Sequence, residues 1–159
     1  MIRVAVLTVS DSVSTGKRKD LSGPAVKRHC EALGWEIVAS DVLADDEAPI
    51  SQKIRDWADK GVASLILTTG GTGISARDNT PEATRGVIER ELPGVSELMR
   101  AKGLEQTHLS VLSRGLAGTR KQALIVNLPG STAGALYSLS VIEALVPHVV
   151  ELLAGNTEH

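Results

Sequence analysis

The chain has 159 residues, the size of one ordinary domain. Its 17 basic and 19 acidic residues leave a formal charge of −2 at pH 7, and its aromatic residues are two Trp and one Tyr. Nucleic-acid-binding domains are usually basic, and those that bind single strands stack bases on aromatic side chains, so neither class fits. We therefore expect one domain over residues 1–159, with an aliphatic core and no nucleic-acid partner.

The location of the protein is predicted from three absences in the sequence. A single cysteine, Cys30, excludes an intramolecular disulfide and fits a reducing compartment. No apolar run approaches the ~18–20 residues that a membrane span requires. The N-terminal residues lack the cleavage site of a signal peptide and are typical of a first strand. These features predict a cytoplasmic protein with no membrane partner.

Apolar runs typical of buried strands alternate with helical patterns along the chain. The predicted strands are Arg3–Ser10, Trp35–Val42, Ser64–Thr68, a short strand within 114–120, and Ala123–Leu128. Helical apolar spacing follows between them, in segments that contain Val26 and Cys30, Ile50 and Ile54, Ala83 and Val87, Val95 and Leu98, and Ala135 and Leu139.

Local signals predict where several of these elements begin and end. The polar residues 11–20 are expected to form a loop. Ser22 is predicted to cap the first helix, with Pro24 in its first turn, and Thr80 to cap a later helix that continues with Pro81. Pro147 is expected to kink or divide the last helix.

Alternating strands and helices predict a three-layer α/β/α sandwich with a mostly parallel central sheet. In such folds ligands bind outside the carboxyl ends of the strands. This rule directs attention to four loops, which are 10–12, 45–47, 70–78 and 127–131.

The loop Thr69–Gly73, with the sequence TGGTG, follows a buried strand directly. Its glycines permit backbone conformations in which successive N–H groups face one anion, so phosphate binding is one interpretation and a flexible turn is the other. Gly71, Gly73 and Ala76 also match a dinucleotide fingerprint. That fingerprint should open a helix directly, whereas the next helix here begins only near Thr80, so a nicotinamide-dependent oxidoreductase is disfavoured.

Acidic residues occur in two of the loops. Asp78 follows the glycine loop closely, where it would repel a phosphate unless a cation such as Mg²⁺ lies between them. The alternative is that Asp78 accepts backbone N–H groups at the helix start. Asp45, Asp46 and Glu47 follow the second strand and form either a solvated charge cluster or part of a cation site.

The turn Asn127–Ser131 places a Gly and a Ser at the start of the last helix, which is either an ordinary cap or an anion site. Ser113 and Arg114 precede it and add positive charge, although solvated surface charge is the simpler interpretation. The four histidines are scattered and form no zinc-ligand spacing.

The segment Leu67–Thr84, LTTGGTGISARDNTPEAT, is far more specific than any of its parts. It resembles the molybdenum-cofactor biosynthesis family that contains the MoaB and Mog proteins and the related G domains of plant and animal cofactor-assembly proteins. Supporting segments occur along nearly the whole chain, namely Ser10–Ser12, Asp20–Pro24, Ser113-Arg114 and Lys121–Ser131.

This resemblance implies a molybdopterin-binding α/β protein. Active members of the family are adenylyltransferases, in which the terminal phosphate of molybdopterin attacks the α-phosphate of Mg²⁺-bound ATP and releases pyrophosphate. The resemblance also implies a homotrimer or homohexamer and a partner enzyme that later inserts molybdate.

Carried over residue by residue, the resemblance implies a set of site residues. Asp46 and Asp78 match the two catalytic acids and would hold Mg²⁺, although a one-residue gap would exchange Asp46 for Asp45. The predicted binding residues are Ser10, Asp11, Thr69, Gly70, Gly71, Thr72, Gly73, Ser113, Arg114, Asn127, Pro129, Gly130 and Ser131.

One departure from the longer Mog-type members concerns activity. Those members carry an insertion after the Asn-Leu-Pro-Gly turn, whereas Ser131 here leads directly into the predicted last helix, as in the short MoaB-type members. Some short members are thought not to catalyse adenylylation in their hosts. A carrier that binds molybdopterin without adenylylating it therefore remains the alternative hypothesis.

Overall fold

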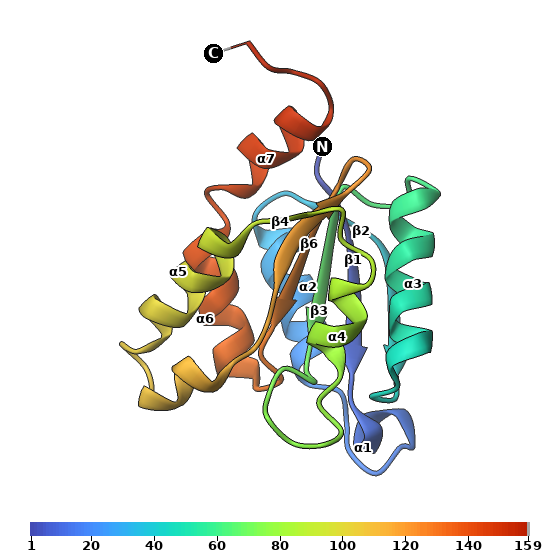
Figure 1. Cartoon of the computed structure of the whole chain (residues 1–159), viewed down its shortest axis with the longest axis vertical. Coiled ribbons are helices and arrows are strands. Elements are labelled where there is room, and N and C mark those ends of the chain that lie inside the picture. Colours follow the sequence, from blue (N-terminus) through green and yellow to red (C-terminus); the bar gives the residue numbers. More distant parts are fainter. Residues whose placement is uncertain (159) are drawn as a thin grey trace.

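A six-stranded sheet forms the middle of the computed structural model, which describes residues 1–158 (Figure 1). The strand order is β2-β1-β3-β6-β5-β4. The parallel part consists of β2 (Glu36–Leu43), β1 (Arg3–Val9), β3 (Leu65–Thr69) and β6 (Ala123–Leu128), and the antiparallel edge of β5 (Ala117–Arg120) and β4 (Arg90–Glu91). The expected mostly parallel sheet is confirmed.

Helices cover both faces of the sheet and complete three layers (Figure 1). In chain order they are α1 (Asp11–Ser14), α2 (Ser22–Ala32), α3 (Glu47–Asp59), α4 (Thr80–Arg85), α5 (Pro93–Gly103), the 3₁₀ helix η1 (His108–Leu112), α6 (Thr132–Ile142) and α7 (Val146–Leu153). Buried residues of α2, α5 and α6 pack on one face, and those of α3 and α4 on the other.

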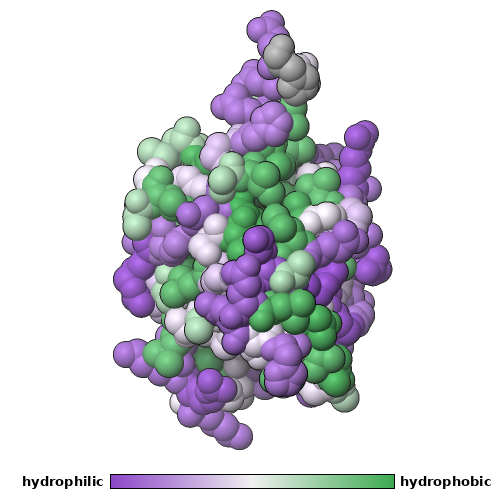
Figure 2. All heavy atoms as spheres, turned by 90° about the vertical axis from the view of Figure 1, so that its left-hand side faces the viewer, coloured by the Kyte–Doolittle hydropathy of each residue, from purple (hydrophilic) through white to green (hydrophobic). Residues whose placement is uncertain are grey.

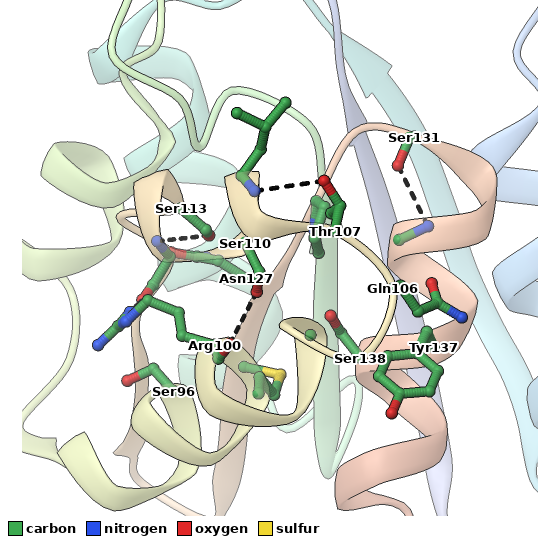
Figure 3. Close-up of a pocket in the computed structure, with 16 residues that line it drawn as sticks. Ser96, Arg100, Gln106, Thr107, Ser110, Ser113, Asn127, Ser131, Tyr137 and Ser138 are labelled. Atoms are coloured by element: carbon green, nitrogen blue, oxygen red, sulfur yellow. Dashed lines mark hydrogen bonds between the residues drawn. The ribbon is translucent and has the colours of Figure 1, made fainter.

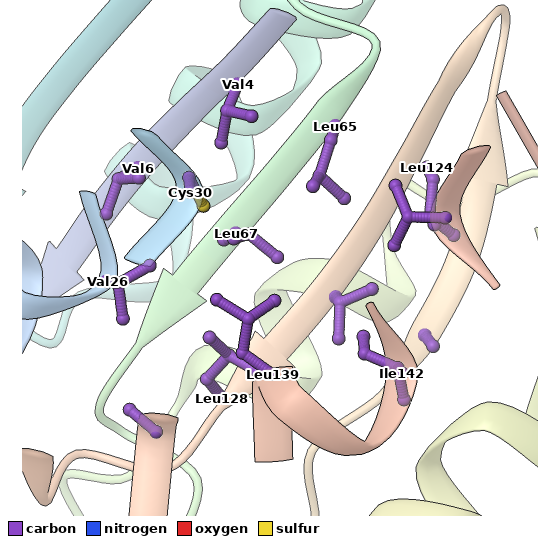
Figure 4. Packing of buried hydrophobic residues seen from close by; sticks show 14 of the residues in the cluster. Val4, Val6, Val26, Cys30, Leu65, Leu67, Leu124, Leu128, Leu139 and Ile142 are labelled. Atoms are coloured by element: carbon purple, nitrogen blue, oxygen red, sulfur yellow. The ribbon is translucent and has the colours of Figure 1, made fainter. Parts of the chain in front are cut away.

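The alternation of side chains along each strand explains why one sheet needs two cores. Val4 and Val6 of β1 belong to one apolar cluster, whereas Ala5 and Leu7 belong to the other. The central strands β1, β3 and β6 are therefore buried at nearly every position, whereas the edge strand β2 includes Glu36, Ser40 and Asp41. Figure 4 shows the first cluster, in which Leu139 of α6 lies close to side chains of the sheet.

Three local predictions require correction. The segment expected to be a loop begins with α1, because the Ser10 hydroxyl accepts a hydrogen bond from the Val13 N–H (3.3 Å) and caps one helical turn. Ser22 lies inside α2, and the Asp20 carboxylate accepts from the Gly23 N–H (3.0 Å) at this helix start. Thr80 lies inside α4, where its hydroxyl donates to the Gly70 carbonyl (2.9 Å) instead of capping.

The end of the chain follows the prediction for Pro147, because α6 and α7 are separate helices with a bend of 63° between them. Within residues 1–158, no single helix is long and apolar enough to cross a membrane. These two helices reach that length and composition only when they are counted together across the bend.

The packing of α6 yields a stability prediction. Leu139 is fully buried, so Leu139→Ala should lower the free energy of unfolding by about 2–5 kcal/mol through lost burial and a residual cavity. Leu104→Ala, at a side chain that is half exposed, should change it by less than about 0.5 kcal/mol. Urea denaturation measures both, and equal effects would contradict the assigned core.

Candidate functional site

The loops after the parallel strands meet at the carboxyl edge of the sheet and enclose three hollows. A charged hollow of about 720 Å³ is lined by residues that follow β1, β2, β3 and β6. A cavity of about 280 Å³ lies among α5, η1 and α6, and it is called the neutral cavity because, among residues 1–158, Arg100 is the one charged residue in its lining. A shallow hollow of about 390 Å³, lined by Gly71, Asp78, Ser113 and Gly130 among others, shares residues with both.

The glycines after β3 bring three loops into close approach. Gly70 and Gly71 have φ values of +104° and +68°, which other residues rarely adopt. A side chain on Gly70 would collide with the Val9 carbonyl, and a Cβ on Gly130 would lie 3.2 Å from the Gly70 Cα. The Thr69 hydroxyl donates to the Pro129 carbonyl (2.7 Å) and fixes the same arrangement.

Two carboxylates occupy the space that side chains on this loop would need. A Cβ on Gly71 would lie 2.7 Å from Asp45 Oδ2, and a Cβ on Gly73 would lie 2.7 Å from Asp78 Oδ2. Asp78 accepts a hydrogen bond from the Ser75 N–H (2.9 Å). The glycine loop therefore runs beside Asp45 and Asp78, and both acids line the charged hollow.

Asp45 is buried, although it is an acid. It accepts from the Asn79 N–H (2.9 Å), and its own N–H donates to Asp11 Oδ1 (3.0 Å). Burial raises the pKa of Asp45, with the charges of Asp78 and Asp11 acting in the same direction, while the Asn79 N–H and Arg77 oppose the shift. A cation at this position would stabilise the ionised carboxylate.

The Asp46 carboxylate pairs with Arg77 and not with the glycine loop. Its carboxylate accepts from Arg77 Nη2 (3.1 Å), and Asp46 does not line the three hollows. Arg77 also binds both carboxylate oxygens of Asp11, at 3.0 Å from Nε and 2.9 Å from Nη2. The structure thus brings Asp45, rather than the predicted Asp46, beside the glycine loop and Asp78.

Arg114, predicted to belong to the pocket wall, instead binds backbone carbonyls of the glycine loop and of Asp78. Its guanidinium donates to the carbonyls of Gly73 (2.7 Å) and Asp78 (2.8 Å) and forms an ion pair with Glu82. It does not line the hollows described above. Its hydrogen bonds hold both ends of the segment 73–78, whose last residue is Asp78.

Asn127 is another predicted binding residue whose contacts are internal. It is buried, and its amide donates to the hydroxyls of Thr68 (3.0 Å) and Thr84 (2.9 Å) and accepts from the Leu116 N–H (3.0 Å). Asn127 also lines the neutral cavity. Its main contribution in this structure is to join β6 to β3, α4 and the segment before β5.

The other predicted residues are divided among the hollows. The charged hollow includes Ser10, Asp11, Thr69, Gly70, Gly71, Gly130 and Ser131. The shallow hollow includes Gly71, Thr72, Gly73, Ser113 and Gly130. The neutral cavity includes Ser113, Asn127, Pro129 and Ser131.

Most of the neutral cavity was not predicted from the sequence. Figure 3 shows its polar lining, including Arg100, Gln106, Tyr137 and Ser138. The Tyr137 hydroxyl donates to Glu105 (2.7 Å), and Arg100 donates to the Gly115 carbonyl (3.2 Å). These residues come from α5, α6 and the segment between them, and no local motif distinguishes them from ordinary polar positions.

Among residues 1–158, no group of three or more His, Cys, Asp or Glu side chains could hold a metal ion. A divalent cation at Asp45 and Asp78 would therefore take its remaining oxygen ligands from water or from a bound phosphate, as Mg²⁺ commonly does.

Comparison with known proteins shows the family to which the chain belongs. The family model described as "Probable molybdopterin binding domain" matches residues 5–148. The chain belongs to this family. Its structure is similar to the molybdopterin biosynthesis enzyme MoaB of Thermus thermophilus, with a TM-score of 0.92 and 44% sequence identity over 98% of each chain.

Two curated relatives match 98% of the chain. The molybdopterin adenylyltransferase of Helicobacter pylori strain J99 is 37% identical, and the match covers 89% of it. The molybdenum cofactor synthesis protein cinnamon of Drosophila melanogaster is 40% identical, and the chain spans 26% of its length. The resemblance inferred from the segment Leu67–Thr84 is confirmed.

The contacts of Asn127 predict a loss of stability on truncation. Asn127→Ala should lower the free energy of unfolding by about 1–3 kcal/mol, because the Leu116 N–H would be left buried without its acceptor. Gln106→Ala, at an exposed residue of the same cavity, is the control and should change it by less than about 0.5 kcal/mol. An unchanged denaturation midpoint for Asn127→Ala would contradict the structural role.

The pairing of Arg77 with Asp11 predicts a shifted titration. The Arg77 hydrogen bonds lower the pKa of Asp11 to about 2, so this carboxylate stabilises the fold above its unfolded pKa, and the contribution is lost as the pH falls from about 4 to about 2. In Arg77→Gln, carboxyl NMR should show the pKa of Asp11 returning toward 3.8. An unmoved Asp11 titration would show that the pair does not form in solution.

Proposed function

We propose that this protein adenylylates molybdopterin, with ATP as the donor and pyrophosphate as the second product. The adenylyltransferase of Helicobacter pylori, matched over nearly the whole chain, supports the reaction class. The observation that carries the proposal is the position of the glycine loop, which borders the charged hollow and reaches the shallow hollow next to the neutral cavity. Two substrates of different chemistry can therefore meet at one loop.

Two of the three hollows, the neutral cavity and the charged hollow, suit the two substrates. The neutral cavity presents hydroxyl, amide and guanidinium groups around Met99, a lining suited to a flat heterocycle with several hydrogen-bonding groups. We assign the pterin to it. The charged hollow has more than twice the volume and contains the carboxylates, so we assign the nucleotide to it.

The reaction needs positioning rather than a side-chain nucleophile. Within the loop Thr69–Gly73, the N–H groups of Gly71, Thr72 and Gly73 would bind the terminal phosphate of molybdopterin, because the Gly70 N–H already donates to the Leu128 carbonyl (3.1 Å). One oxygen of that phosphate attacks the α-phosphorus of ATP and forms the new P–O bond. The bond from this phosphorus to the oxygen bridging the β-phosphate breaks, and its electron pair leaves on pyrophosphate.

The acidic residues fit Mg²⁺. Asp45 and Asp78 supply hard oxygen ligands, and their carboxylates occupy the space beside Gly71 and Gly73 that side chains at those positions would need. We propose that these two residues hold the ion, with Asp45 in the role that the family resemblance implies for Asp46. Bound Mg²⁺ would neutralise phosphate charge at the reacting centre. Arg114 would keep Asp78 in position through its carbonyl.

We further propose a homotrimer or homohexamer that acts in the cytoplasm and passes its product to a molybdate-inserting enzyme. Figure 2 views the side that carries α5 and α6, where apolar surface lies between hydrophilic side chains. Leu109, Val111 and Leu112 of η1 are exposed and supply apolar surface for self-association. Light scattering that gave the mass of a monomer at micromolar concentration would overturn this part of the proposal.

Turnover by carboxamide variants tests the reaction and the metal assignment together. With molybdopterin, ATP and Mg²⁺, mass spectrometry should detect adenylylated molybdopterin, and EDTA should abolish its formation. Asp45→Asn and Asp78→Asn should each lower kcat by about 10²–10³-fold, because each removes an anionic ligand of the Mg²⁺ that would neutralise the reacting phosphates. Asp46→Asn is the matched control and should retain activity within about threefold.

Asp45→Asn and Asp78→Asn should still bind molybdopterin, so a loss of turnover in these variants would reflect catalysis and not binding of the pterin. Loss of activity in Asp46→Asn with full activity in Asp45→Asn would reverse the assignment of the second acid. Failure of the unmodified protein to form product while it retains the pterin would instead support the carrier hypothesis. That hypothesis rests on Ser131, which leads directly into α6 as in the short MoaB-type members.

A further inference from the structure

The segment between α1 and α2 places two basic side chains at the charged hollow. Arg18 and Lys19 line it, whereas the neighbouring Lys17 does not. Both residues are exposed, and within residues 1–158 neither has an acidic partner in an ion pair. Arg77, the third basic side chain of the hollow, is already bound to Asp11 and Asp46. Arg18 and Lys19 therefore supply the uncommitted positive charge.

Hydrogen bonds hold this segment at both ends. The backbone N–H groups of Lys17 and Arg18 donate to the Ser12 carbonyl, at 2.9 and 3.1 Å. At the other end, the Asp20 carboxylate accepts from the Thr8 hydroxyl (2.8 Å) and from the Gly23 N–H (3.0 Å). A Cβ on Gly23 would lie 2.6 Å from Asp20 Oδ2, so the glycine is needed for this attachment. The two basic residues are thus carried on a backbone fixed to β1 and α2.

The electrostatic balance of the hollow depends on these two residues. Its lining includes four acidic side chains, Asp11, Asp20, Asp45 and Asp78, and three basic ones. Without Arg18 and Lys19, the acids would exceed the remaining base by three charges. Such a surface would repel a nucleotide polyphosphate, even with one divalent cation at the reacting centre.

The order of the strands places this segment away from the neutral cavity. The segment follows β1 and the wall Asn127–Ser131 follows β6, while the glycine loop follows β3 between them. Figure 1 shows α1 and the loop after it on the opposite side of the carboxyl edge from η1. A leaving group that departs in line from a nucleophile on the neutral-cavity side would therefore move toward Arg18 and Lys19.

We propose that Arg18 and Lys19 bind the β- and γ-phosphates of the nucleotide and stabilise the charge that collects on pyrophosphate as it leaves. The direction of departure rests on the proposed adenylyl transfer. The binding itself requires only a polyphosphate in the charged hollow. Arg18 and Lys19 then determine that the protein selects nucleoside triphosphates over monophosphates.

Calorimetric titration without pterin tests the binding directly. The ligands are Mg²⁺-bound ATP, inorganic pyrophosphate and AMP, and the protein is compared with the double variant Arg18→Ala/Lys19→Ala. The variant should bind ATP and pyrophosphate about tenfold or more weakly, because it loses charge-assisted contacts. Its affinity for AMP should stay within about twofold. Lys17→Ala removes one positive charge next to the hollow and should bind all three ligands like the unmodified protein.

Several outcomes would overturn the inference. They are unchanged binding of ATP and pyrophosphate by the double variant, an equal loss for AMP, an equal loss in Lys17→Ala, and no pyrophosphate binding by the unmodified protein. The equal loss in Lys17→Ala would mean that diffuse surface charge is responsible.

Turnover assays of the same proteins, combined with the calorimetry, distinguish this inference from the proposed function. If the unmodified protein forms no adenylylated product but its pyrophosphate binding depends on Arg18 and Lys19, the proposed function fails and the phosphate site stands. If turnover proceeds and the double variant has the unmodified KM for ATP and the unmodified inhibition by pyrophosphate, the proposed function stands and this inference fails.

Discussion

The close approach of three loops at Gly70 is the constraint on which the rest of the site depends. The loop after β3 passes between the Val9 carbonyl and Gly130, in a left-handed conformation and with no room for a side chain. This passage sets the glycine loop next to both carboxylates and beside the start of α6. The parallel register of β1, β3 and β6 ends all three strands at one edge, so the loops can meet there.

Charged side chains divide the carboxyl edge of the sheet into regions suited to different ligands. Asp45 and Asp78 lie beside the glycines, Arg77 compensates Asp11 and Asp46, and Arg18 and Lys19 have no acidic partner in the described chain. The cavity under η1 is lined mainly by neutral groups. A reaction between two phosphates needs cationic groups between the phosphates and the carboxylates, because phosphate and carboxylate repel one another wherever no cation intervenes. Arg114 keeps the glycine loop and Asp78 in a fixed relative position, because its guanidinium donates to the carbonyls of both Gly73 and Asp78.

The sequence predicted those features that depend on local pattern. Aliphatic runs marked the parallel strands, and the glycines after Thr68 marked the loop, because few other residues adopt their backbone conformations. Features that depend on long-range contacts were beyond such patterns. The choice between Asp45 and Asp46 depends on which carboxylate Arg77 engages, and the caps expected at Ser22 and Thr80 failed because Asp20 and the Gly70 carbonyl provide other partners. The neutral cavity joins α5, η1 and α6, which no single motif links.

A crystal structure with Mg²⁺ and the α,β-methylene analogue of ATP would test the division of the site most directly, because this analogue cannot release pyrophosphate. We expect the nucleotide in the charged hollow, with its β- and γ-phosphates in contact with Arg18 and Lys19. We expect Mg²⁺ between its phosphates and Asp45 and Asp78, and the neutral cavity left open. A nucleotide bound in the cavity beside Tyr137, with its phosphates far from Arg18, would contradict this division of the site.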